Sequence, residues 1–599
     1  NAWRYRDWVI RSLNQNQPFD DFVVEQLAGD LLANPGQEQL IATGLHRMNI
    51  KNNESGINQE DYRNRETVDR INTTGTALLG LTIGCAQCHT HKYDPISQSE
   101  YYRLYAFFNN ADEEDLEIEG NSVERDRYQQ AKNAYEAGKK RLEARKSLIE
   151  SMRKHKTPGD WLKSLDDNSA MSLLNVFDLS GELISAICHT PSAASPDPAV
   201  QEFWDSLAAR QDDTLKAIRQ LSVENRHLPR PYIMTLAEST TGRRPTHVLL
   251  RGDFKQKGKV VTAGTPAVLN PLSVRGKAGD RLDLAAWIVH RNNPLTARVA
   301  VNHIWMHLFG SGIVATPDDF GTQGAPPTHP ELLDWLAVEF MESGWDRKQL
   351  IRTIVMSATY RQDSATRAAP GENHSAGWKN AAVIDPENRL LSRQSRFRVE
   401  AEVIRDLFLD AGGLLYPAIG GPTVHPELPA SVSHLGYKYQ TRWLTSNRPQ
   451  RYRRGLYIHF KRTNPYPSLI LFDGPESNVC QAKRNRSNTP LQALATLNDP
   501  VFFECAQSLG HRLSRLPDSD ESRLQYAGRL CLTRLFQPRE VQELQRLLAA
   551  ERVLYAATPE AAAELAGDSV DNTVSSSEAA AWIAVSRTIL NLDEFITRE

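Results

Sequence analysis

Apolar residues recur at helical spacing along most of the chain, and this periodicity predicts a mainly α-helical protein. Near the N-terminus, Trp8, Leu13 and Leu27 belong to such a pattern, which ends at the stop signals of residues 34–36 (Asn-Pro-Gly). The aromatic stretch from Tyr101 to Phe108 predicts another helix. We expect further helices over residues 283–290, 296–309, 328–343, 347–359, 400–409, 489–497 and 503–513.

Signals for β-structure are confined to short stretches. Residues 247–250 and 260–263 flank a turn rich in Gly and Lys, which predicts a hairpin, and residues 455–460 predict one more strand. The helix over 328–343 should begin with a capping box between Thr328 and Glu331. The predicted fold class is therefore mainly α: a multi-domain helical protein with a minor β-hairpin or small sheet.

Changes in composition divide the chain into three parts. Residues 1–112 are predicted to form a helical domain, residues 113–235 a charged helical insert or linker, and residues 236–599 a C-terminal, mainly helical domain. Within the insert, residues 123–155 are strongly charged with sparse apolar positions. That pattern is typical of a long exposed helix or of half a helical hairpin.

Composition excludes several classes of protein. The chain is 40% apolar and 24% charged, as an ordinary globular protein is. No apolar run approaches the roughly 18 residues of a membrane span. Lys and Arg number 70 against 73 Asp and Glu, so no basic field points to nucleic acid. The chain starts at Asn1 inside a helical pattern without a signal peptide, which we interpret as a cut N-terminus.

Residues 85–89 (Cys-Ala-Gln-Cys-His) form the C-x-x-C-H pattern by which c-type haem is attached. Two thiols at this spacing lie about one helical turn apart and can add to the two vinyl groups of one porphyrin. The imidazole of His89 follows directly and can ligate the iron. The sequence therefore predicts one covalent haem c bound by Cys85, Cys88 and His89. Candidates for the sixth iron position are Met48, His91 and His46.

Other interpretations of the same residues remain open. Cys85 and Cys88 could be a redox-active dithiol, although no thioredoxin-like βαβ context is evident. With His89 and His91 they could bind zinc, although four ligands within seven residues close a tetrahedron poorly. They could also have a buried structural role without a cofactor. The remaining cysteines could form disulfides whose pairing is open: Cys188, Cys480, Cys505 and Cys531.

A second candidate site lies in residues 442–486, where ten Lys or Arg stand against only two acidic residues, with aromatic residues between them. Guanidinium groups match planar anions, and aromatic rings can stack on sugars. We therefore consider a site for an acidic or sulfated glycan, or for haem propionates; the alternative is a solvated face with core aromatics. The residues proposed for this site are Arg451, Arg453, Arg454 and Arg462.

Two histidines form a weaker candidate. His303 and His307 are four residues apart on one predicted helix and could share a metal ion. Packed or capping histidines beside Trp305 and Phe309 are the alternative.

Segments on both sides of the pentapeptide are recognisable. They include residues 69–74 (Asp-Arg-Ile-Asn-Thr-Thr), 79–84 (Leu-Gly-Leu-Thr-Ile-Gly) and 91–96 (His-Lys-Tyr-Asp-Pro-Ile). Later segments of the same kind are residues 293–298, 302–305, 309–321, 329–336, 357–362, 388–391, 489–494 and 497–500. In these segments the chain resembles the planctomycete cytochrome c domain-containing proteins, over about residues 1–112 and 236–599. The resemblance implies an exported protein with two adjoining domains of unknown function, often preceded by a separate cytochrome c module.

These observations lead to two expected functions. The first is an exported or periplasmic c-type haem protein in electron transfer or haem-based redox chemistry, linked to polysaccharide degradation, with a redox protein or the upstream cytochrome module as partner. The second is a carbohydrate-binding or scaffolding protein whose Cys/His cluster is structural or binds a non-haem metal such as zinc. The sequence contains neither G-x-S-x-G nor H-E-x-x-H, so it indicates no particular enzymatic activity.

Overall fold

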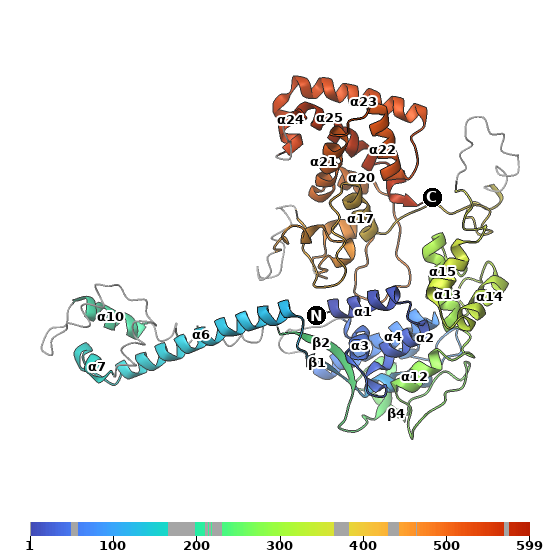
Figure 1. Cartoon of the computed structure of the whole chain (residues 1–599). Helices are drawn as coiled ribbons and strands as arrows, with labels where there is room; N and C mark the ends of the chain where they lie inside the picture. Colours follow the sequence, from blue (N-terminus) through green and yellow to red (C-terminus); the bar gives the residue numbers. More distant parts are fainter. Residues whose placement is uncertain are drawn as a thin grey trace. The chain divides into compact units, whose positions relative to one another are not determined.

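The computed structural model describes residues 2–49, 58–165, 198–209, 214, 217, 230–364, 383–428, 443–462, 464–567 and 574–598 (Figure 1). The chain divides into two compact units. The first comprises Asn1–Glu114 and Met234–Glu599, and the second comprises Asp115–Ile233. The described chain is mainly helical with three small two-stranded sheets, so the predicted fold class is confirmed.

The N-terminal part of the first unit packs around the aromatic helix α5 (Gln98–Asn109). Tyr101, Tyr102, Phe107 and Phe108 of this helix are almost fully buried in one apolar cluster. Each large apolar side chain buried in this way contributes roughly 1.5–3 kcal/mol. The other elements of this part are α1 (Trp3–Asn14), α2 (Phe19–Ala28), η1 (Gly29–Leu31), α3 (Gln37–Ala42), η2 (Thr43–Arg47), α4 (Gln59–Thr74), the π-helical turn η3 (Gly75–Leu79) and the 3₁₀ turn η4 (Ile83–Gln87).

Three pairs of short strands occur among the described residues. The predicted hairpin is confirmed, because β3 (Thr246–Leu249) and β4 (Lys257–Val261) pair antiparallel. The other two pairs are β1 (Ala111–Glu117) with β2 (Tyr232–Glu238), and β5 (Phe397–Arg398) with β6 (Thr597–Arg598).

The strand predicted over residues 455–460 is wrong. Residues Gly455–Tyr457 form the 3₁₀ turn η8, and Ile458 makes only an isolated bridge to Val424. Tyr457 and Ile458 are adjacent in sequence and both buried, which a turn permits and a strand with one exposed face does not.

The second unit contains a long helix with a small apolar end. Helix α6 (Ser122–Met152) confirms the long exposed helix predicted in the insert. Lys–Glu pairs spaced i,i+4 lie along it, as between Lys139 and Glu143. Its last turn buries Ile149 and Met152 against Trp161 and Phe203. Its described residues also include the helices α7 (Pro158–Ser164) and α10 (Pro198–Ala209).

Helices make up most of the remaining first unit. Helix α13 (Thr296–Phe309) has the predicted bounds, and Gly310 ends it with φ 81°. Helix α14 (Pro330–Glu342) starts later than predicted and lacks the capping box, because His329 rather than Thr328 is its N-cap residue; Thr328 Oγ1 donates to the carbonyl of Ile313. The other elements are α12 (Arg281–Ile288), α15 (Arg347–Val355), α17 (Ala401–Ala411), η5 (Leu250–Gly252), η7 (Gln450–Tyr452), α19 (Pro467–Leu471), α20 (Pro490–Asn498), α21 (Pro500–Ser514), α22 (Asp520–Leu532), α23 (Pro538–Ala557), α24 (Pro559–Ala566), α25 (Ser576–Leu590) and α26 (Asp593–Ile596).

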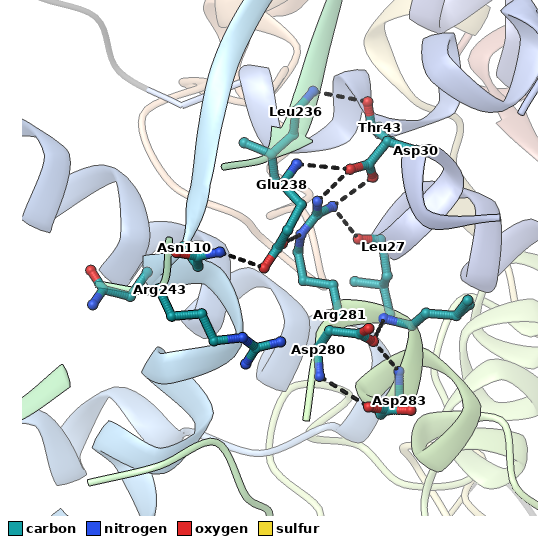
Figure 2. A network of polar contacts seen from close by, with 12 residues as sticks. Leu27, Asp30, Thr43, Asn110, Leu236, Glu238, Arg243, Asp280, Arg281 and Asp283 are labelled. Atoms are coloured by element: carbon teal, nitrogen blue, oxygen red, sulfur yellow. Dashed lines mark hydrogen bonds and ion pairs between the residues drawn. The ribbon is translucent and has the colours of Figure 1, made fainter. Parts of the chain in front are cut away.

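A buried arginine ties α12 to the N-terminal helices (Figure 2). Arg281 is 0% exposed and donates to both oxygens of Asp30, at 2.9 and 2.6 Å, and to the carbonyl of Leu27 at 3.0 Å. Its Nε also reaches Glu238 of β2 at 3.4 Å. The Leu236 N–H in turn donates to Thr43 Oγ1. Three segments distant in sequence are thereby fixed to one another.

Candidate functional site

The C-x-x-C-H segment begins in a tight turn at the protein surface. Cys85 lies within the 3₁₀ turn η4, and Cys88 follows directly with helical φ and ψ of −97° and −29°. Cys85 and Cys88 are thus three residues apart at the end of this turn, the spacing at which side chains of a 3₁₀ helix are eclipsed. Both cysteines are exposed, whereas Ala86 between them is fully buried and anchors the turn in the core.

Two neighbouring elements fix the backbone of this turn. The Gln87 carbonyl accepts hydrogen bonds from Tyr102 Oη and from Gln98 Nε2, both at 3.0 Å. Gln98 also donates to the carbonyl of Leu249 in β3 at 3.1 Å. At Gly252, which has φ +76°, an added Cβ would lie 3.0 Å from Cys88 Sγ. The loop of the hairpin therefore closes against one thiol, and it needs a glycine at this position.

The His89 imidazole is exposed and oriented through one ring nitrogen. Its Nδ1 lies 2.7 Å from the Thr90 carbonyl oxygen, which can only accept a hydrogen bond. The proton of the neutral ring is therefore assigned to Nδ1, which leaves the lone pair on Nε2. Metal-binding histidines usually donate their second ring N–H in this way. Two accessible thiols and this imidazole are the donor set that c-type haem requires, so the residues fit the group.

His91 and Asp94 have a different environment and are 8% and 7% exposed. His91 Nδ1 accepts the Asp94 N–H at 2.8 Å, which places the ring proton on Nε2. Asp94 Oδ1 accepts from the N–H and hydroxyl of Thr322, at 2.7 and 3.0 Å. These contacts hold the chain after the motif against the segment following α13, and they do not present His91 as a ligand. Its role at the iron stays a prediction.

The other metal ligands considered from the sequence do not converge. Within the described ranges, no three side chains of His, Cys, Asp or Glu are grouped so as to hold a metal ion, which gives the four-ligand zinc site no support. His303 Nε2 lies 3.3 Å from the Pro317 carbonyl oxygen, and burial lowers the pKa of this histidine. His307 is mostly exposed and lies 3.8 Å from Glu400.

The cysteines outside the motif are free thiols where the structure describes them. Cys480 is exposed, whereas Cys505 and Cys531 are buried. Burial raises the pKa of Cys531 to about 12, so this thiol stays protonated. Cys188 lies outside the described residues, and the disulfides considered from the sequence are not formed by the three others.

The arginines predicted to bind an anion or a glycan have partners within the protein. Arg451 pairs with Glu504 at 3.0 Å and with Glu427 at 3.4 Å. Arg454 lies 3.5 Å from Asp406. Arg453 is 3% exposed, stacks on Tyr457 at 3.7 Å and donates to the carbonyls of Ala418, Gly420 and Pro422. The three guanidinium groups are thus engaged in packing, and a glycan or anion role for them stays a prediction.

Arg462, predicted to bind an anion or a glycan, and Met48, a candidate iron ligand, lie at the same cavity. The guanidinium of Arg462 donates to the carbonyl of Met48 at 2.9 Å, and both residues line a cavity of about 430 Å³. Asp69 and Cys480 line it too, whereas Cys85, Cys88 and His89 do not. Nothing in the sequence pairs Asp69 with Cys480, and the cavity was therefore not predicted.

Fold and site together define a mainly helical, multi-domain protein that presents a C-x-x-C-H segment at its surface. Two family models match it: PSCyt2, a protein of unknown function (DUF1549), over residues 1–113, and PSD1, a protein of unknown function (DUF1553), over residues 280–548. The chain therefore belongs to the planctomycete cytochrome c domain-containing proteins, which carry this pair of adjoining domains. No curated protein and no solved structure matches it. Among the described helices, none has the length and apolar character to cross a membrane.

Proposed function

We propose that the protein carries one c-type haem attached at Cys85 and Cys88, with His89 Nε2 as an iron ligand. The observation that carries this proposal is the exposure of both thiols together with the hydrogen bond of the His89 ring. The two exposed cysteines are three residues apart at the end of a turn, and the imidazole that follows has its Nδ1 engaged by a backbone carbonyl. Each thiol would add across a vinyl group, forming an S–C bond while its hydrogen passes to the neighbouring carbon, so no oxidant is required.

The surroundings of the motif support a rigid attachment point. Gln87 is held by α5, Ala86 is buried, and Asp94 is bonded to Thr322 of the PSD1 domain. Preorganised supports of this kind keep ligand side chains in a fixed geometry. When bound, the haem would supply one-electron redox chemistry.

We infer an exported or periplasmic location, because haem c is attached outside the cytoplasmic membrane. The family names and the resemblance to cytochrome-associated proteins support the same compartment. An exposed motif leaves room for a partner at short distance, and we propose a redox protein or a separate cytochrome module in that role. Electron transfer is therefore the function that we assign to the site.

The test compares matched cysteine variants produced in cells that mature c-type cytochromes. We expect covalent haem, detected by peroxidase staining of denaturing gels, in the wild type and in Cys480→Ser, whose thiol is also exposed but lies outside the motif. Cys85→Ser and Cys88→Ser should each weaken the signal, and the double variant should lose it. Haem that persists in the double variant, or an unstained wild type beside a stained control cytochrome, would contradict the proposal.

The iron ligand is tested by the spectrum of the matured protein. His89→Ala should lose the bands of histidine-ligated iron, whereas His91→Ala should keep them, since His91 Nδ1 is engaged by Asp94. The opposite result would assign the ligand to His91.

A further inference from the structure

One cavity lies between the two family domains. On the side of PSCyt2 it is lined by Leu45, Met48 and Asn49 at the end of η2, and by Asp69 and Thr73 of α4. On the side of PSD1 the lining residues are Phe460, Arg462 and the segment 477–480 (Ser-Asn-Val-Cys). Its volume of about 430 Å³ falls within the usual range of small-molecule sites, roughly 300–1,000 Å³.

Two residues of the lining have an acceptor oxygen without a hydrogen-bond donor among the described residues. Asn49 is 7% exposed, and its Nδ2 donates to Glu113 at 3.3 Å, but its Oδ1 has no hydrogen-bond partner among the described residues. The Asp69 carboxylate likewise forms no hydrogen bond or ion pair in the described part of the chain. Burial raises the pKa of Asp69, and the nearby Arg70 and Arg462 oppose that shift. Buried polar groups are nearly always hydrogen-bonded, so Asn49 Oδ1 is an exception, and the partly exposed Asp69 carboxylate is an acceptor in the lining that a ligand can use.

The remaining lining residues narrow the chemistry of that ligand. Arg462 is the basic residue among them, held by the carbonyls of Met48 and Asn49, so its charge balances that of Asp69. A neutral ligand is favoured for this reason. Hydroxyl and amide groups from Thr73, Ser477 and Asn478 can donate or accept, and Phe460 offers an apolar ring. A protonated amine would satisfy one acceptor, but it would meet Arg462 and leave the neutral polar groups unused.

We propose that this cavity binds one small, neutral, polyhydroxylated molecule of about the size of a single sugar ring. Its hydroxyls would donate to the carboxylate of Asp69, and its C–H face would pack on Phe460. The site does not involve Cys85, Cys88 or His89, and the inference is therefore independent of the haem proposal.

Cys480 provides a built-in reporter of binding, because its exposed thiol lines the same cavity. Native full-length protein is alkylated with iodoacetamide, and each cysteine is followed by peptide mass spectrometry. The probes are glucose, galactose, mannose, fucose and myo-inositol, with cyclohexylamine as a cationic comparison. At ten times its dissociation constant, a ligand leaves about one site in eleven free, so alkylation of Cys480 should slow about tenfold. Alkylation of Cys85 and Cys88 in haem-free protein should not change.

Variants of one helix separate binding from general damage. Asp69→Asn should weaken the affinity for the protecting polyol by about tenfold or more, because a charged acceptor becomes neutral and one of its two oxygens is replaced by an NH₂ donor. Asp61→Asn, on the same helix α4 but outside the cavity, should leave the affinity unchanged. Val479→Trp fills the cavity from an exposed position and should abolish protection without altering any polar group.

Each outcome decides the proposal. A polyol that protects Cys480 in wild type and Asp61→Asn but not in Val479→Trp supports it. Protection by none of the polyols, or by cyclohexylamine alone, overturns it. Full protection retained in both Asp69→Asn and Val479→Trp would also overturn it, because the ligand would then bind elsewhere.

Discussion

Replacing Arg281 with Ala should destabilise the first unit by about 3–5 kcal/mol. The guanidinium of Arg281 is 0% exposed and donates two hydrogen bonds to the Asp30 carboxylate, at 2.9 and 2.6 Å (Figure 2). The Asp30 side chain is only 7% exposed, so its charge would remain buried without a partner. Glu238 is 19% exposed and lies farther away, at 3.4 Å, so water can compensate part of its loss. Most of the expected effect therefore comes from Asp30.

Urea unfolding followed by tryptophan fluorescence measures this effect, and the buried Trp287 reports from the same helix. With an m-value of about 1–3 kcal/mol per M, a loss of about 3–5 kcal/mol should lower the midpoint of the transition by about 1–5 M. Arg291→Ala is the matched control, because Arg291 and Glu342 pair at 2.8 Å with 69% and 53% of their side chains exposed. Such a pair contributes about 0–1 kcal/mol. Equal midpoint shifts for the two variants would refute the importance of the buried network.

Three further predictions concern pH and the contact between the domains. Burial, with Arg70 and Arg281 nearby, holds the pKa of His46 well below 6.5, so below pH 6.5 the unfolded state binds a proton that the folded state does not. As the pH is lowered below 6.5, the free energy of unfolding should fall by about 1.4 kcal/mol per pH unit until the folded-state pKa of His46 is reached, and His46→Gln should remove that slope. If the urea midpoints of the wild type and His46→Gln change with pH in parallel, the prediction is contradicted. In the C-terminal helices, hydrogen bonds from Arg552 lower the pKa of Glu578 and Asp520, so the stability they provide is present above about pH 4 and is lost as the pH falls through their folded-state pKa values. Arg552→Met should therefore lower the midpoint at pH 7 by an amount worth about 1 kcal/mol, since these side chains are partly exposed, and its difference from the wild type should shrink steadily as the pH falls below about 4. A difference that does not change with pH would point to lost packing. Asp94→Ala should destabilise the first unit by about 1–3 kcal/mol, because it removes the acceptor of the Thr322 N–H and hydroxyl. Hydrogen exchange at the Thr322 amide should become faster; unchanged exchange there would show that this contact does not hold the two family domains together.

Helix periodicity gave the most accurate sequence predictions. Helix α13 has the predicted bounds because its apolar positions repeat over fourteen residues and Gly310 can adopt the positive φ that ends it. The capping box at Thr328 did not form, since the helix begins after His329 and the Thr328 hydroxyl donates to the Ile313 carbonyl, fifteen residues earlier. A local pattern cannot reveal such a distant partner.

Charge patterns were the least reliable guide to a site. The arginines of residues 451–454 suggested a free basic surface, yet Arg453 is buried on Tyr457 and bonded to carbonyls of the loop 418–422. Main-chain acceptors carry no signature in the sequence, so a cluster of arginines does not show whether its charges face solvent or backbone. The acidic strand β1 was missed for a related reason, since Glu113 is held there by Arg70 of α4.

The sequence also could not predict which distant residues meet at the cavity. Asp69 and Cys480 belong to different family domains and meet only in the folded chain. By contrast, the C-x-x-C-H motif is local, so its residues could be named before the structure. The structure added that the thiols are exposed and that His89 is engaged at Nδ1.

The central claim is tested most directly by the haem stoichiometry of the wild-type protein purified from cells that mature c-type cytochromes. A pyridine haemochrome spectrum, combined with the mass of the proteolytic peptide containing residues 85–89, reports both the amount and the place of attachment. We predict one haem per chain, with its mass on that peptide and both thiols consumed. An unmodified peptide with two free thiols, from cells that load a control cytochrome fully, would contradict the account.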